Sequence, residues 1–134
     1  MTDRLRLQLP SLLNAGWLIV HLFLVGAIAW WAFILAWPEP TFSTSKAYAE
    51  FARIRPDEGY WATGFGIAAA IGVWGLVTRS RAIRIGSTLL LGVNHGMVAW
   101  LVGKGSPSGT GTGLYFLVML LAYALTIREG QRVT

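Results

Sequence analysis

The sequence predicts an all-α integral membrane bundle of four transmembrane helices, and three observations support this fold class. Hydrophobic residues make up 54% of the 134 residues and charged residues only 13%, whereas a typical soluble domain carries roughly 25% charge. Four long apolar runs cover most of the chain. The run from Trp61 to Val77 contains Thr63 as its only polar side chain, so it lacks the polar face of a soluble helix. We therefore expect one transmembrane domain over residues 1–134.

The four runs have the lengths of membrane spans, which need about 20 residues. The predicted spans are about residues 12–37, 60–78, 83–103 and 111–128. The first run follows Arg4 and Arg6, as the apolar part of a signal peptide would. However, it is far longer than the roughly 7–15 residues of such a segment, and no A-x-A-like cleavage site follows it. We expect it to be a retained span.

The segment 43–55, between the first two spans, is predicted to form a short amphipathic helix that lies on the outer surface or caps the bundle. Proline precedes it at 38 and 40 and ends it at 56. Asp57 and Glu58 then begin the second span, where carboxylates are favoured by the helix dipole. The apolar residues of the segment fall on one face and its charged residues on the other: Ala47, Tyr48, Phe51 and Ile54 against Lys46, Glu50 and Arg53.

Basic residues predict the orientation of the spans. If the N-terminus is cytoplasmic, seven of the eleven basic residues lie in cytoplasmic segments, and the positive-inside rule favours this arrangement. The tight turn between the second and third spans contributes most through Arg79, Arg81 and Arg84. Both termini are therefore expected in the cytoplasm. Because the net charge of +5 belongs to residues that flank apolar runs, it indicates lipid contact, and no nucleic-acid partner is expected.

Small residues recur at a spacing of four in the second and third spans. Residues at this spacing share a helix face and let another backbone approach closely. We expect tight packing through them, either within one chain or between copies. The ladders are Ala62, Gly66 and Ala70; Gly64, Ala68 and Gly72; and Gly92 with Gly96.

Three polar residues fall inside the apolar runs, namely His21, Asn94 and His95. Hydrogen bonding between helices is the simplest role for them, and a polar lining for a pore or binding cavity is the alternative. The two histidines could also be axial haem ligands, which would require them to lie at similar depth on facing helices. The chain contains no CxxCH motif for covalent haem attachment, and we expect no cofactor.

The sequence shows no constellation for catalysis or metal binding. It has no cysteine, and all six carboxylates lie outside the predicted spans. The glycine-rich stretch 103–113 is not a phosphate-binding loop, because its Gly-Lys pair comes first and Lys104 is not followed by Ser or Thr. We expect neither catalytic residues nor a metal site, and no enzyme activity.

Two stretches resemble small four-span proteins encoded by tailed bacteriophages and prophages, some of them labelled holin-like. One contains Ser-Thr-Ser-Lys-Ala-Tyr at 43–48 and Arg-Pro-Asp-Glu-Gly-Tyr-Trp at 55–61, followed by the arginine-rich turn. The other is Ser-Pro-Ser-Gly-Thr-Gly-Thr-Gly-Leu-Tyr at 106–115. The resemblance covers roughly residues 42–127. It implies a bacterial inner (cytoplasmic) membrane protein of phage origin, with no known catalytic residues.

Taken with the small-residue ladders, these features predict a non-enzymatic protein that self-associates in the lipid bilayer and forms holin-like pores or lesions. Two alternatives remain open. The chain could be an accessory subunit of a larger membrane complex, or a small channel lined by Asn94 and His95. Its expected partners are therefore lipid and either copies of itself or other membrane subunits.

Overall fold

The computed structural model describes residues 2–78 and 80–131, which contain helices and no strands. This architecture confirms the predicted all-α bundle. The long helices are α1 (Thr2–Ala36), α3 (Glu58–Val77), α4 (Arg81–Gly105) and α5 (Thr110–Gln131), and two short ones lie between α1 and α3: η1, a 3-10 turn (Lys46–Tyr48), and α2 (Ala49–Ile54).

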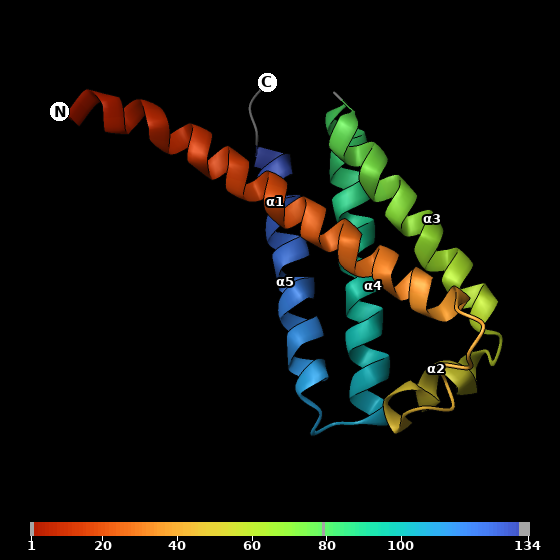
Figure 1. Ribbon diagram of the computed structural model, residues 1–134. Coiled ribbons are helices and arrows are strands. Elements are labelled where there is room, and N and C mark those ends of the chain that lie inside the picture. The colour runs from red at the N-terminus through yellow and green to blue at the C-terminus, as the bar shows by residue number, and fades with distance from the viewer. Residues whose placement is uncertain (1, 79, 132–134) are drawn as a thin grey trace.

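Two helix boundaries differ from the apolar pattern. Helix α1 begins at Thr2 rather than near residue 12, and its N-terminal part projects away from the other helices (Figure 1). Helical hydrogen bonds form within one segment, so a helix can continue beyond the apolar stretch that marks its membrane portion. The amphipathic helix is shorter than predicted, because Ser45 is extended and its side chain accepts a hydrogen bond from the Ala47 N–H as the N-cap of η1.

The long helices pack in chain order, α1 on α3, α3 on α4 and α4 on α5, while α5 has little contact with α1. The start of α1 and the end of α5 lie on the same side of the bundle as the α3–α4 connection (Figure 1). We call this side, with Arg81, Arg84 and the end of α5, the arginine end. The opposite side, with residues 37–57 and 106–109, is the loop end.

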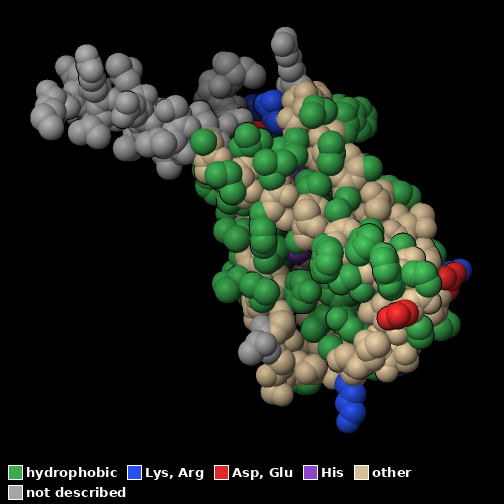
Figure 2. Space-filling view, viewed as in Figure 1, with side chains coloured by type: hydrophobic (Ala, Val, Ile, Leu, Met, Phe, Trp, Pro, Cys, Tyr) green, Lys and Arg blue, Asp and Glu red, His purple; other side chains and the backbone are tan. Residues whose placement is uncertain are grey.

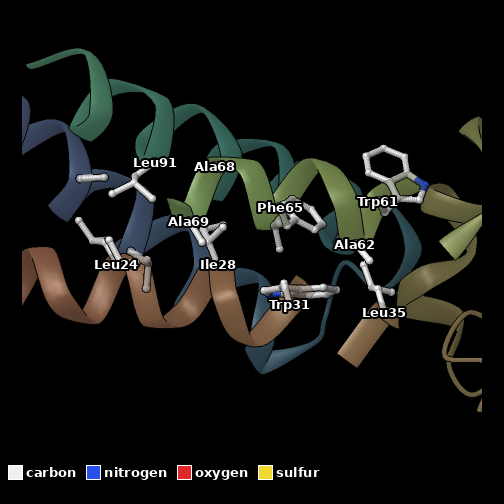
Figure 3. Close-up of a cluster of buried hydrophobic side chains, with 14 of the residues drawn as sticks. Leu24, Ile28, Trp31, Leu35, Trp61, Ala62, Phe65, Ala68, Ala69 and Leu91 are labelled. Atoms are coloured by element: carbon white, nitrogen blue, oxygen red, sulfur yellow. The ribbon is translucent and has the colours of Figure 1, made fainter. Parts of the chain in front are cut away.

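All four long helices contribute to the core, and part of it lies between α1 and α3. Figure 3 shows side chains of α1 pointing toward α3, with Leu91 entering from α4. Ile28 and Leu91 are 0% exposed and Phe65 only 1%. Because lipid is as apolar as these residues, close packing rather than removal from water holds such helices together.

The surface confirms the membrane class. Four helices are long and apolar enough to cross a membrane, and large hydrophobic side chains cover their outward faces, including Ile19, Val77 and Trp100 at 66%, 75% and 66% exposure. On the face in Figure 2, charged side chains lie toward the two ends and hydrophobic ones between them. The chain is therefore a multi-pass membrane protein.

Residues at the start of α3 hold the loop end together. Asp57 caps α3 by accepting hydrogen bonds from the Gly59 and Tyr60 N–H groups. Glu58 has an additional role, because its carboxylate accepts the N–H groups of Thr41 at 3.0 Å and Phe42 at 2.6 Å. Phe51 of α2 is fully buried beneath this loop, whereas Ile54, predicted on the same face, is 60% exposed because α2 ends there.

Candidate functional sites: the groove between α3 and α4 and the polar pocket at the arginine end

The small residues of α3 divide between two sides of the helix. Ala62, Ala68 and Gly72 are buried within the chain. Gly64 and Ala70 are exposed and Gly66 is half-buried, and a Cβ added to either glycine would meet nothing within 4 Å. Each predicted ladder is thus divided between residues packed inside the chain and residues that face the surroundings.

The closest approach of α3 to its neighbours occurs near the arginine end. A Cβ on Gly72 would lie 2.7 Å from Cγ2 of Val25, and a Cβ on Gly75 would overlap the side chain of Ser87 on α4. Gly75 falls outside both predicted ladders. It follows Gly72 by three residues, a spacing that also places residues on one helix face.

Gly92 and Gly96 form the contact between α4 and α5. A Cβ on Gly92 would lie 3.3 Å from the ring of Tyr123, and one on Gly96 would lie 2.9 Å from the sulfur of Met119. This glycine pair therefore accommodates bulky side chains of α5 within the same chain.

A groove of about 920 Å³ runs between α3 and α4 on the outside of the bundle. Gly64 and Ala68 contribute small residues to its lining, and Asn94 contributes an amide near the middle of α4. The Nδ2 group of Asn94 donates to the Leu90 carbonyl at 2.8 Å. Other lining residues include Tyr60, Ile67 and Met97. Apolar side chains therefore form most of this groove, and the Asn94 amide lies midway along it.

Asn94 and His95 do not share a lining, although they are adjacent in sequence. His95 is fully buried in the helix core, and its Nδ1–H donates to the Leu91 carbonyl at 2.8 Å. Its Nε2 has no hydrogen-bond partner among the described residues. Asn94 instead borders the groove. The structure therefore does not favour a single channel wall built from both residues.

The two histidines also lie at different depths. His21 is buried beside α3, where its Nε2–H donates to the Gly72 carbonyl at 3.2 Å, and it borders the same place as Gly75 and Ser87. His95 lies eight residues beyond Ser87 on α4, which is about 12 Å along a helix. This separation does not favour binding of one iron between them.

A polar pocket at the arginine end was not predicted. Its volume is about 150 Å³, and Trp17, His21, Arg84, Arg128 and Glu129 are among its lining residues. Glu129 is only 5% exposed. Its carboxylate lies 3.1 Å from Nε of Arg84 and 3.6 Å from Nη1 of Arg128.

Two further hydrogen bonds join α4 to α5 near this pocket. Arg81 donates to the Gly130 carbonyl, and the hydroxyls of Thr88 and Thr126 lie 3.0 Å apart. Arg81 and Arg84 thus bind α5 in addition to carrying charge, whereas Arg79 lies outside the described residues. The sequence did contain a signal for the Arg84–Glu129 pair, because two consecutive spans return the chain to the same side of the membrane.

Fold and surface together define the class, an all-α multi-pass membrane protein with four helices able to span a bilayer. No protein-family model, curated protein or solved structure matches the chain.

Proposed function

We propose that the chain is a small, non-enzymatic protein of a bacterial inner membrane that self-associates through the groove between α3 and α4. The surroundings of Gly64 support this proposal most directly. It is exposed on a helix able to span a membrane, it lines the groove, and a Cβ there would meet nothing within 4 Å. A glycine in mid-helix costs stability relative to alanine. No contact within the described chain requires it, whereas close approach of a second helix would.

A second copy of the chain is the occupant that we propose. In a head-to-tail arrangement, α3 of one copy would pack in the groove of the next, and such heterologous contacts extend into rings or larger assemblies. The Asn94 amide, half-buried in the groove, would then bond across the interface, where such contacts contribute about 0.6–2 kcal/mol.

The consequence of association is holin-like: as copies accumulate, larger oligomers open pores or lesions in the membrane. In the proposed orientation the arginine end faces the cytoplasm, together with both termini. Arg81, Arg84 and Arg128 support this, since all three lie at that end and basic residues concentrate on the cytoplasmic side of membrane proteins.

Replacing Gly64 by leucine is expected to weaken self-association at least about tenfold, because the side chain fills the groove where the second helix would pack. The measurement is energy transfer between labelled copies in lipid vesicles as the protein-to-lipid ratio rises. Gly26→Leu is the matched control, since Gly26 is an exposed glycine on α1 where an added Cβ also meets nothing within 4 Å.

Three results would contradict the proposal. The wild-type chain could remain monomeric at high density, or Gly26→Leu could impair association as much as Gly64→Leu. A different membrane subunit could also co-purify in fixed proportion, which would favour the accessory-subunit function.

For the lytic step, expression of the wild-type chain alone should collapse the membrane potential of the cells, and expression of Gly64→Leu should not.

A further inference from the structure

The pocket at the arginine end is an unusual feature for a membrane bundle, because charged side chains surround unfilled space. Two guanidinium groups, Arg84 and Arg128, line it with the single carboxylate of Glu129. These three side chains carry a net positive charge. The side chains of Arg84 and Arg128 are 26% and 20% exposed, so both are partly withdrawn from solvent. Charge interactions are stronger in such a partly buried site than in water.

Arg84 has hydrogen-bonding capacity left for a ligand. Its Nε–H donates to Glu129 and its Nη1 to the Thr78 carbonyl at 3.4 Å. Its Nη2 has no hydrogen-bond partner in the part of the chain that the structure describes. Arg128 is held across the pocket, with its guanidinium carbon 5.1 Å from the centre of the Trp17 ring. Planar arginine forks of this kind match the oxygens of a phosphate group.

The pocket lies near the ends of three long helices. Gly75 lies two residues before the end of α3, Arg84 three residues after the start of α4, and Arg128 three residues before the end of α5. The pocket therefore lies near the ends of three helices that can span a membrane, which in a bilayer is the level of the headgroups. Leu18 on its rim is 52% exposed and continues into the apolar face of α1, along which an acyl chain can lie.

From these observations we propose that the pocket binds the phosphate of an anionic phospholipid headgroup. Basic pockets between helices at a membrane surface are suited to such headgroups. The pocket volume of about 150 Å³ is sufficient for the five heavy atoms of a phosphate group, since a water molecule occupies about 30 Å³ in the liquid. The proposal is independent of self-association.

Charge variants with opposite expected effects test this. Delipidated protein in mild detergent is titrated with phosphatidylglycerol, and bound lipid is counted by native mass spectrometry. Arg128→Gln is expected to weaken binding about fivefold, the effect of one basic residue near a membrane surface. Glu129→Gln is expected to tighten it by a similar factor, because it removes the competing negative charge. Tighter binding would not result from misfolding, so this variant remains informative if Arg128→Gln folds poorly.

Two further experiments distinguish an effect at the pocket from a general effect of charge, and a lipid headgroup from free phosphate. Lys104→Gln, an equal loss of charge at the loop end and outside the pocket lining, should change binding less than twofold. Phosphatidylcholine should bind more weakly than phosphatidylglycerol, and inorganic phosphate alone should not bind measurably. Weaker binding by Glu129→Gln, equal effects of Lys104→Gln and Arg128→Gln, or binding of inorganic phosphate in place of lipid would overturn the proposal.

Discussion

Replacing Trp31 by alanine is expected to lower the free energy of unfolding by about 3–5 kcal/mol, the usual cost of removing a large aromatic side chain from a packed core. Trp31 is only 5% exposed. Its ring centre lies 5.6–6.1 Å from four other aromatic rings, contributed by η1, α2, α3 and α5: Tyr48, Phe51, Phe65 and Tyr115. Alanine would remove the contacts that these four elements share at one side chain.

The neighbouring Trp30 provides a matched control for this prediction. Trp30 is 60% exposed and stacks on Phe33 of its own helix at 5.6 Å. Trp30→Ala should therefore cost less than about 1 kcal/mol. Both variants can be unfolded by titrating a denaturing detergent into mixed micelles, with tryptophan fluorescence and circular dichroism as probes. Equal losses for the two variants would show that the aromatic cluster does not hold the loop end together.

Replacing Gly75 by alanine is expected to destabilise the bundle by about 3 kcal/mol, at the upper end of the usual cost of overpacking. The new methyl group would overlap Oγ and Cβ of Ser87, so α3 and α4 would have to move apart. The same unfolding titration measures the effect. Gly86→Ala is the control, since Gly86 is exposed on α4 and an added Cβ would meet nothing within 4 Å. Alanine there should leave stability unchanged or raise it slightly.

A second substitution tests the assigned cause. In the double variant Gly75→Ala with Ser87→Gly, both overlapping atoms are gone and the next contact, Cε1 of His21 at 3.7 Å, is an ordinary one. Most of the lost stability should return, as a coupling energy between two residues in contact. If the double variant is as unstable as the sum of the single ones, the close approach of α3 and α4 is not the reason for the glycine.

The spacing of the small residues predicted tight packing of α3 but not which of its faces is buried. Spacing identified α3 as a tightly packed helix, because residues four apart share a face in any helix. It did not reveal that Ala68 and Gly72 pack inside the chain while Gly64 and Ala70 face outward. In a membrane both the core and the lipid are apolar, so hydrophobic periodicity does not distinguish an inward face from an outward one.

The pocket at the arginine end could not be predicted from the sequence for a different reason. Arg84 and Glu129 are separated by 45 positions in the sequence, and each is an ordinary flanking residue when considered alone. The charge pattern predicted a role in orientation for the basic residues and gave no sign of their contacts. Their pairing depends on α4 and α5 being adjacent, which the glycines at 92 and 96 allow.

The amino-acid sequence was sufficient to establish the class of protein, since uncharged runs of about 20 residues can satisfy their backbone hydrogen bonds in lipid only as helices. It also indicated a short helical segment between α1 and α3, although η1 and α2 cover only residues 46–54 of the predicted 43–55. The packing of the helices was needed to show which glycines contact which helix, that Asn94 borders a groove while His95 lies in the core, and that Glu129 is buried between two arginines. The physical reason is that these features depend on the rotation of each helix about its own axis. That rotation is set by side-chain packing between helices distant in the sequence.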